Sequence, residues 1–413
     1  MKTSFPKDKI RVLLLESVHA RASDAFENES FRVESVPGAL SEDELCERIG
    51  DAHLVGIRSK TQISERVLDE AKRLLAVGCF CIGTNQVDLE SARARGVPVF
   101  NSPFSNTRSV AELVIAQTIA LNRRLLDRSG ELHRGEWNKS ASGAHEVRHR
   151  TLGIIGYGHI GSQVSVLGEA LGMRVLYFDV IPKLPLGNAR QVGSLDELLE
   201  QSDVVTLHVP ADASTSGLIG EQQLARMKAG AMLLNNARGS IVDLGALARA
   251  LKDGRIGGAA LDVFPEEPKS GAERFESPIQ GLPNVILTPH IGGSTEEAQE
   301  NIALDVSTKL TRFVNIGSTT GAVNVPEVEL PSQPRPDGGD RAHRILHFHK
   351  NVPGVLSKMH HAMSELGANV SGEYLRTDGE LGYVVLDVDP TDGEALMVRL
   401  RAIPETVRTR ILW

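Results

Sequence analysis

A glycine fingerprint in the middle of the chain constrains the fold more than any other feature of the sequence. Gly156, Gly158 and Gly161 follow the apolar run 152–155, and a segment with helical patterning comes after them. Between a strand and a helix, glycines at this spacing permit a tight turn, a close approach of pyrophosphate to the backbone, and close helix packing. The phosphates then meet the positive end of the helix. We therefore predict a dinucleotide-binding unit here.

An acidic residue at the end of the next strand narrows the choice of dinucleotide. The apolar run MRVLYFD ends at Asp179, at the offset of roughly 20 residues from the fingerprint where a carboxylate binds the adenosine ribose. Because its charge would repel a 2′-phosphate, the sequence favours NAD over NADP. A tight turn that binds no cofactor would explain the glycines, but it would not explain an acid at this offset.

The charge balance of the chain argues against a nucleic-acid scaffold. The 413 residues include 53 acidic and 45 basic side chains, a formal net charge of −8, and the basic residues form no long run. Phosphate backbones are bound by clustered cations, so we expect at most a local pocket for a small anion. The length allows about three domains.

The amino-terminal segment predicts a first strand rather than a signal peptide. In MKTSFPKDKIRVLLLES the apolar core spans only 12–15 before Glu16, and no stretch of the chain approaches membrane-spanning length. Cys46, Cys79 and Cys81 suit a reducing compartment, and the last two fit buried thiols on an apolar strand better than a metal pair. We expect a soluble, cytoplasmic protein without metal or membrane partner.

The order of elements predicts an α/β protein of three parts. Strands and helices alternate over 10–100, with a capping box at Ser41 and Glu44, and a long helix follows that we expect Ser109 and Glu112 to cap. Strands then alternate with helices from about 150 to 291, which predicts a doubly wound parallel sheet of the Rossmann type. A helix opened by Ser294 with Glu297 would return the chain to the first part.

The carboxyl-terminal region predicts a separate small domain. The stretch NVPEVELPSQPRPDGGD breaks the periodicity and indicates a semi-rigid linker. The segments after it follow the order βαββαβ of a ferredoxin-like domain. The expected boundaries are 1–105 with 295–325 for a discontinuous substrate-binding domain, 106–294 for the inserted dinucleotide-binding domain, 326–340 for the linker and 341–413 for the terminal domain.

Three side chains after predicted strands suit the oxidation of an alcohol. His290 follows VILTP, Arg238 follows MLLNNA, and Glu267 follows AALDVF. Hydride transfer from a secondary alcohol needs a base for the hydroxyl proton and a cation for the substrate carboxylate, and a carboxylate beside the base favours its protonated form. Each residue alone fits a structural role better. Together, in loops downstream of a cofactor cradle, they predict a catalytic site.

These motifs resemble the D-isomer-specific 2-hydroxyacid dehydrogenases. GYGHIG at 156–161, LHVP at 207–210, NNARGSIVD at 235–243, DVFPEEP at 262–268 and TPHIGGST at 288–295 carry the resemblance over nearly the whole chain. It assigns catalysis to Arg238, Glu267 and His290, and it alone selects Glu267 over Glu266. It further implies NAD contacts at the following residues: Tyr157, His159, Ile160, His208, Pro210, Ala237 and Asp262.

Other stretches are similar to the family members that oxidise 3-phosphoglycerate and carry one terminal ACT domain. GIRSKT, GCFCIGTNQVDL and NSPFSNTRSVAELV carry this likeness. It implies production of 3-phosphohydroxypyruvate, the first committed step of L-serine biosynthesis, and also reduction of 2-oxoglutarate. Relatives often carry a second arginine at Lys60, where an ammonium loses the bidentate geometry. The implied substrate contacts are Arg58, Ser59, Lys60, Asn106 and Lys139, although Lys139 suits a solvated surface charge better and Arg58 and Lys60 suit one equally well.

The terminal domain resembles ACT domains that bind an amino acid across a dimer interface. On that resemblance His349, Asn351 and Asn369 are expected to contact L-serine as a feedback inhibitor, and a homotetramer is implied. His347 and His349 share one strand face, where both could simply cover the sheet. Two alternatives stay open at this stage: a family member acting on glyoxylate, hydroxypyruvate, lactate or 2-oxoglutarate, and a non-enzymatic NAD-sensing corepressor.

Overall fold

The structure of the protein is a computed structural model that describes residues 5–268, 273–331 and 343–412. The chain divides into two compact units, one formed by 106–298 and the other by 1–105 together with 299–413. The expected linker 326–340 lies outside the described residues from 332 onward. Its first part packs against the second unit, since Val328 is only 1% exposed. In the described part of the chain, no helix combines the length and apolar character needed to cross a membrane.

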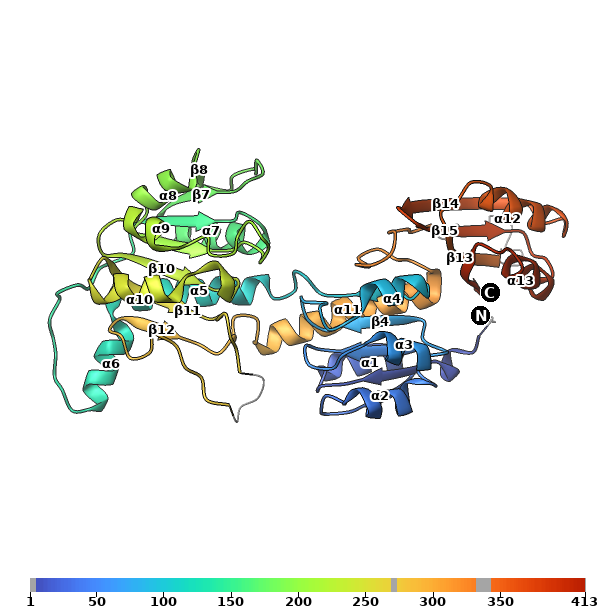
Figure 1. Ribbon diagram of the computed structural model, residues 1–413, viewed down its shortest axis with the longest axis horizontal. Coiled ribbons are helices and arrows are strands. Elements are labelled where there is room, and N and C mark those ends of the chain that lie inside the picture. The colour runs from blue at the N-terminus through green and yellow to red at the C-terminus, as the bar shows by residue number, and fades with distance from the viewer. Residues whose placement is uncertain (1–4, 269–272, 332–342, 413) are drawn as a thin grey trace. The chain divides into compact units, whose positions relative to one another are not determined.

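The unit 106–298 is built on a parallel seven-stranded sheet, which confirms the predicted Rossmann-type fold (Figure 1). Buried residues of α5 and α7 pack on one face of the sheet, and those of α8, α9 and α10 pack on the other. In spatial order the strands are β12 (Val285–Leu287), β11 (Ile256–Leu261), β10 (Ala231–Asn235), β9 (Val204–Leu207), β6 (Thr151–Ile155), β7 (Arg174–Phe178) and β8 (Arg190–Gln191). The helices are α5 (Thr107–Arg123), α6 (Leu125–His133), α7 (His159–Ala170), α8 (Leu195–Gln201), α9 (Glu221–Arg226) and α10 (Leu244–Lys252).

The other unit contains two sheets. The first is parallel, in the order β2-β1-β3-β4-β5, and the second is antiparallel, in the order β14-β15-β13-β16. The first consists of β1 (Arg11–Leu14), β2 (Arg32–Ser35), β3 (Leu54–Ile57), β4 (Ala76–Cys79) and β5 (Val99–Phe100), with α1 (Ala20–Asn28), α2 (Glu42–Ile49), α3 (Glu65–Glu70), α4 (Leu89–Ala94) and α11 (Glu296–Ile316). The second consists of β13 (His343–Lys350), β14 (Val370–Asp378), β15 (Leu381–Val388) and β16 (Thr406–Leu412), with α12 (Val355–Ser364) and α13 (Gly393–Arg401).

The antiparallel sheet has the predicted βαββαβ order and is covered by different partners on its two faces. One face carries α12 and α13 over a core that includes Ile345, Val384 and Leu386. The other face contributes Leu346 and Phe348 to a core shared with α11 and the parallel sheet. Arg344 is buried there and forms an ion pair with Asp387 at 2.7 Å, while its guanidinium also donates to the Leu330 carbonyl. The terminal domain is therefore tightly packed on its own unit.

Local helix signals were partly misassigned. The capping box of Ser41 and Glu44 is present, but the predicted cap at Ser109 is wrong, because α5 begins at Thr107 and Ser109 lies within its first turn. There its hydroxyl is 2.9 Å from the hydroxyl of Thr295. Thr295, not Ser294, opens α11, since its hydroxyl accepts the Ala298 amide at 3.1 Å. The helix α1 and the short edge strands β2 and β8 were not predicted from the sequence.

Candidate active site

The carboxyl edge of the seven-stranded sheet gathers the residues predicted for cofactor binding and catalysis. All seven strands are parallel, so the loops that follow them emerge at one edge. The fingerprint follows β6, Asp179 follows β7, and His208 follows β9. Arg238, Glu267 and His290 follow β10, β11 and β12, three adjacent strands. Fold topology alone thus places the catalytic candidates beside the cofactor candidates.

The glycine turn has the shape that a dinucleotide pyrophosphate requires. Gly156 has φ 91°, and an added Cβ there would lie 2.5 Å from the His208 carbonyl oxygen. A Cβ on Gly161 would overlap the Gly156 carbonyl oxygen. Gly158 differs, because no atom beyond its chain neighbours lies within 4 Å of its Cβ position, and it is the N-cap residue directly before α7. The first and third glycines are needed for packing, and the second leaves open space at a helix amino terminus.

Asp179 is held at the end of β7 by two backbone amides. Its Oδ2 accepts from the Tyr157 N–H at 2.8 Å, and its Oδ1 accepts from the Ile181 N–H at 3.0 Å. A carboxylate offers about four acceptor positions, so both oxygens can still accept ribose hydroxyls. The carboxylate is therefore fixed directly beside the fingerprint turn.

His208 carries a buried nitrogen that has no hydrogen-bond partner. Its Nε2 is 3.0 Å from the Thr206 hydroxyl, whereas its Nδ1 is buried and unsatisfied. Burial lowers the pKa of His208 to about 3, so the imidazole is neutral. An orphaned polar atom beside the glycine turn fits a cofactor group that would complete its bonding.

The remaining cofactor candidates differ in how they face the cradle. The Tyr157 side chain is buried, stacks on Tyr177 with ring centroids 3.9 Å apart, and donates to the Ser165 hydroxyl, so only its backbone lies at the turn. His159 is exposed on the first turn of α7 with Ile160 partly buried behind it. Of the other two candidates, Pro210 is exposed and Ala237 is buried.

Arg238 is presented by a loop that Asn235 folds. The Asn235 carboxamide accepts from the Ala237 N–H at 3.1 Å and donates to the Arg238 carbonyl at 2.9 Å. The exposed Arg238 guanidinium donates to the Ala237 carbonyl at 2.7 Å. A Cβ on the next residue, Gly239, would overlap the Phe264 backbone, so this loop lies against the one that carries Glu267.

Glu267 and His290 form a direct polar pair. The Nδ1 atom of His290 is 2.9 Å from Oε2 of Glu267, while Oε1 accepts from the Phe264 N–H at 3.1 Å. The side chains are 53% and 37% exposed, so the pair remains open to a ligand. Because a carboxylate only accepts, Nδ1 carries the proton and the Nε2 lone pair is free to act as a base.

Asp262 organises the loop that carries His290. Its carboxylate accepts from the Thr288 hydroxyl at 2.6 Å and from the amides of Ile291 and Gly292 at 2.8 and 2.7 Å. Its carbonyl accepts from the His290 N–H at 2.8 Å. His290 has φ 54°, in the left-handed region that side chains disfavour. Asp262, predicted as a cofactor contact, therefore also supports a strained loop.

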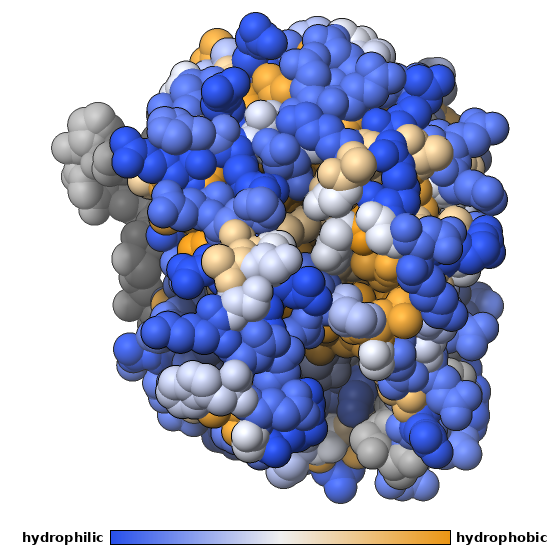
Figure 2. Space-filling view, turned by 90° about the vertical axis from the view of Figure 1, so that its left-hand side faces the viewer, coloured by the Kyte–Doolittle hydropathy of each residue, from blue (hydrophilic) through white to orange (hydrophobic). Residues whose placement is uncertain are grey.

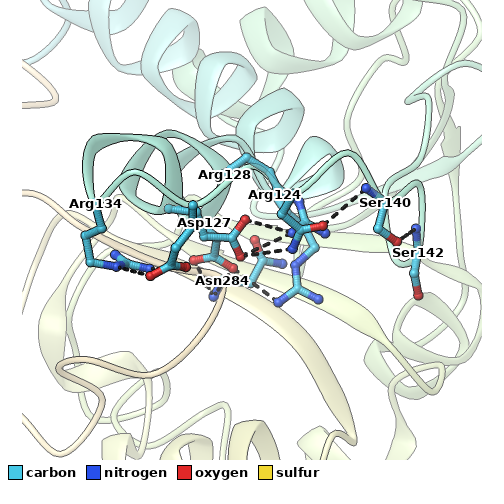
Figure 3. Close-up of polar contacts among 10 residues, drawn as sticks. Arg124, Asp127, Arg128, Arg134, Ser140, Ser142 and Asn284 are labelled. Atoms are coloured by element: carbon cyan, nitrogen blue, oxygen red, sulfur yellow. Dashed lines mark hydrogen bonds and ion pairs between the residues drawn. The ribbon is translucent and has the colours of Figure 1, made fainter.

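Asn106 and Lys139 are placed differently within this unit. A Cβ on Gly293 would overlap the Asn106 carboxamide, whose Oδ1 is buried without a partner, so Asn106 lies beside the His290 loop. Lys139 is exposed on the segment after α6. Figure 3 shows how α6 is anchored, through Asp127, which accepts from the Asn284 amide before β12. That contact is at the opposite edge of the sheet from His290, and among the described residues Lys139 makes no hydrogen bond or ion pair with the catalytic loops.

Arg58, Ser59 and Lys60 belong to the other unit, in the loop that follows β3. Ser59 and Lys60 are exposed and Arg58 is partly buried. Their side chains come from the carboxyl edge of a parallel sheet, as expected for ligand contacts.

The effector candidates lie at opposite ends of the antiparallel sheet. Asn351 follows β13 and is bonded to the strand turn at Gly379 and Glu380, whereas the Asn369 carbonyl accepts from Asp389 beyond the far end of β15. The separation along β15 from Leu381 to Val388 is seven residues, or roughly 23 Å at the rise of an extended strand. His349 is buried beneath Gly382. One chain does not bring the three residues together.

Asn235 and Thr288 are site residues that the sequence analysis missed. Each is polar, lies at or after the end of a buried strand, and bonds the loop around a catalytic candidate. The two adjacent asparagines in NNARGS are the sequence signal that could have identified this loop. The structure buries both Asn235 and Asn236. The Asn236 carboxamide donates to Gln117 of α5 at 2.7 Å, which fixes the same loop from the other side.

Comparison with known proteins agrees with this geometry. Residues 115–292 match the family described as D-isomer specific 2-hydroxyacid dehydrogenase, NAD binding domain, and residues 345–408 match an AHAS small subunit-like ACT domain. The chain is 52% identical to the D-3-phosphoglycerate dehydrogenase of Dictyostelium discoideum over 411 residues, covering 100% of this chain and 99% of the relative. It is 51% identical to the enzyme of the same name from Haemophilus influenzae over 413 residues, with the same coverage.

Solved structures support the same fold. The crystal structure of D-lactate dehydrogenase from Aquifex aeolicus, complexed with NAD and lactic acid, matches with a TM-score of 0.64 and 28% identity, covering 76% of this chain and all of that one. The glycine cradle, the fixed Asp179 carboxylate and the orphaned His208 nitrogen fit the NAD that these matches assign.

Proposed function

The chain belongs to the D-isomer-specific 2-hydroxyacid dehydrogenases, and we propose that it oxidises 3-phosphoglycerate to 3-phosphohydroxypyruvate with NAD. The observation that carries this proposal is the convergence of Arg238, Glu267 and His290 on the edge of the sheet that holds the NAD cradle. The full-length relatives named D-3-phosphoglycerate dehydrogenase support the choice of substrate. The reaction would commit carbon to L-serine.

The side chains divide the chemistry among them. The glycine turn, Asp179 and His208 would hold NAD, which when bound would supply the acceptor for the hydride of the carbinol carbon. His290 accepts the hydroxyl proton at Nε2, and Glu267 stabilises the resulting imidazolium through the 2.9 Å contact at Nδ1. Arg238 binds the substrate carboxylate with its planar guanidinium and polarises the forming carbonyl. Asn235 and Asp262 hold these groups in place before substrate arrives.

The phosphate end of the substrate requires cations outside this trio. We assign it to Arg58 and Lys60, with Ser59 as a hydroxyl donor, because the three follow one strand in a loop that leaves them open to a ligand. Asn106 beside the His290 loop adds a carboxamide whose buried unsatisfied oxygen can accept from a substrate hydroxyl, not from the phosphate. Lys139 contributes only if it comes from another copy of the chain.

The proposal is tested by NAD reduction with a panel of hydroxy acids. The purified protein should reduce NAD with 3-phosphoglycerate and use D-lactate, D-glycerate and D-2-hydroxyglutarate poorly, since those lack the phosphate that Arg58 and Lys60 would neutralise. Better turnover of an unphosphorylated acid would overturn the substrate. Tight NAD binding without turnover of any acid would favour an NAD-sensing role.

Serine inhibition is proposed through paired terminal domains. Asn351 and Asn369 lie at opposite ends of one sheet. A single small amino acid can therefore contact both only where Asn351 of one terminal domain meets Asn369 of a second copy. L-serine offers the carboxylate, ammonium and hydroxyl that His349, Asn351 and Asn369 can bond. The sheet shares a core with α11, which gives bound serine a physical connection to the rest of its unit.

We further propose that the protein is a homotetramer located in the cytoplasm. Figure 2 shows a face that is largely hydrophilic, with apolar side chains gathered in patches. Leu125, Leu126, Leu132 and Trp137, on α6 and the segment after it, are 48–82% exposed, and exposed apolar clusters of this kind mark interfaces. Light scattering of Leu126→Glu should reveal a smaller assembly than the parent. The proposed location in the cytoplasm rests on a separate observation. Cys46, Cys79 and Cys81 are free thiols, which suits a reducing compartment.

A further inference from the structure

Glu16 is a buried acid that touches the candidate phosphate loop and has no role in the chemistry described above. It lies two residues beyond Leu14 of β1, and Arg58 lies two residues beyond Gly56, the partner of Leu14 on the neighbouring strand β3. Only 8% of Glu16 is exposed. Within the described part of the chain, its carboxylate forms no ion pair with a lysine or arginine.

The Glu16 carboxylate is surrounded by three backbone amides of the loop. Its Oε1 accepts from the Thr61 N–H at 2.8 Å and the Arg58 N–H at 3.3 Å, and its Oε2 accepts from the Lys60 N–H at 3.0 Å. Three amides therefore turn inward toward one acid. The side chains of this loop differ in exposure: Thr61 is buried, whereas Ser59 and Lys60 are exposed.

The carbonyl side of the same loop is held by a second group. Nε2 of Gln86 donates to the Arg58 carbonyl at 2.6 Å and to the Gly83 carbonyl at 3.1 Å. The Cys81 thiol also contacts the Arg58 carbonyl, at 3.5 Å. Arg58 thus has both its amide and its carbonyl fixed, by residues that follow two other strands of the sheet.

We propose that Glu16 is a positioning residue that shapes the loop 58–61 for a phosphorylated substrate; this rests on the proposed function. A carboxylate bonded to several amides stabilises one loop conformation, so less conformational entropy is lost when the phosphate binds. The same carboxylate places a negative charge at the backbone of the loop that carries Arg58 and Lys60. Glu16 and Ser17 have φ 62° and 51°, a disfavoured backbone that surrounding contacts must maintain.

The variant Glu16→Gln isolates this role. In this variant the carboxamide oxygen can still accept from the Thr61 and Arg58 amides. The NH₂ group then faces the Lys60 N–H, and because both groups are donors, the hydrogen bond to Lys60 is lost. Losing a charged hydrogen bond of this kind costs roughly 10- to 100-fold in binding, so the KM for 3-phosphoglycerate should rise by that factor. The kcat and the KM for NAD should stay within about twofold, because Arg238, Glu267 and His290 are untouched. Glu47→Gln, on the exposed face of α2, removes the same charge without a contact and should match the parent.

A wild-type measurement keeps the inference testable even if the variant folds poorly. Amide hydrogen exchange should show protection at Lys60, an exposed residue whose amide is otherwise open to solvent. Fast exchange at Lys60 and Thr61, or an unchanged KM in Glu16→Gln, would overturn the proposal. If the wild-type protein fails to oxidise 3-phosphoglycerate, the proposed function is wrong, and the exchange pattern still decides whether Glu16 holds the loop.

Discussion

The Nδ1 atom of His290 lies 2.9 Å from Oε2 of Glu267, although the two residues are 23 positions apart in the chain. They follow adjacent parallel strands, β12 and β11, so the sheet brings them together. The neighbouring Glu266 has the same chemistry but no such contact. The structure therefore distinguishes two acids that residue type alone leaves equivalent.

Glu267→Gln should lower kcat for 3-phosphoglycerate oxidation by about 10- to 100-fold, because the imidazolium formed during catalysis loses its charged partner at Nδ1. Glu266→Gln is the matched control and should retain nearly full activity. Steady-state kinetics of both variants decide the assignment, and equal losses would show that the contact with His290 has no catalytic role.

Cofactor choice depends on Asp179. Asp179→Asn keeps one oxygen for a backbone amide but removes the charge that opposes a 2′-phosphate. The ratio of kcat/KM for NAD to kcat/KM for NADP should fall roughly tenfold or more. A hydrogen bond to a charged group changes a binding free energy by about enough to give a factor of that size. Kinetics with both cofactors measure it, and an unchanged ratio would mean that another acid binds the ribose.

Acid sensitivity is expected from His347 in the terminal sheet. Burial lowers the pKa of His347 to about 3, with a further contribution from His349, while its Nε2 bonds the Thr406 hydroxyl. The unfolded state therefore takes up the proton first as pH falls below the ordinary value of 6.5. Stability is complete above that pH and is lost progressively between about 6.5 and 3, at up to about 1.4 kcal/mol per pH unit.

Replacing His347 tests this linkage. When the pH is lowered by about two units, from 7 to 5, the thermal midpoint of His347→Gln should fall less than that of the wild type. This comparison holds even if the substitution itself lowers the stability of the variant at neutral pH. His133→Gln alters an exposed histidine and should follow the wild type. A parallel decline of His347→Gln and wild type would show that this histidine does not control acid unfolding.

Serine sensitivity should depend on Asn369. Asn369→Ala should raise the serine concentration for half inhibition at least about tenfold, within the usual range of coupling energies, while uninhibited kcat stays near normal. Val398→Ala, on the exposed face of α13, is the control. Full serine sensitivity in Asn369→Ala would place the effector site elsewhere. Deleting the terminal domain is less informative, because Leu346 and Phe348 belong to a core shared with α11.

Features set by contiguous residues were predictable from the sequence. The glycine turn, the strands and the position of Asp179 depend on neighbours within one βα unit, where spacing and apolar runs carry the signal. Helix starts were less secure, because Ser109 with Glu112 has the same pattern inside a first turn as at a cap. The long-range roles of Glu16 and Asp262 were out of reach, since each bonds backbone that only the folded sheet places beside it.

The central claim is that the loops after β10, β11 and β12 perform the chemistry next to the NAD cradle. The most direct test compares NAD reduction by wild type and His290→Ala with 3-phosphoglycerate, alongside NAD affinity measured by calorimetry. We predict a loss of about 10²- to 10⁴-fold in kcat with NAD affinity nearly unchanged, because the base acts on the substrate proton and not on the cofactor. A variant that turns over at the wild-type rate would contradict the assignment of the active site.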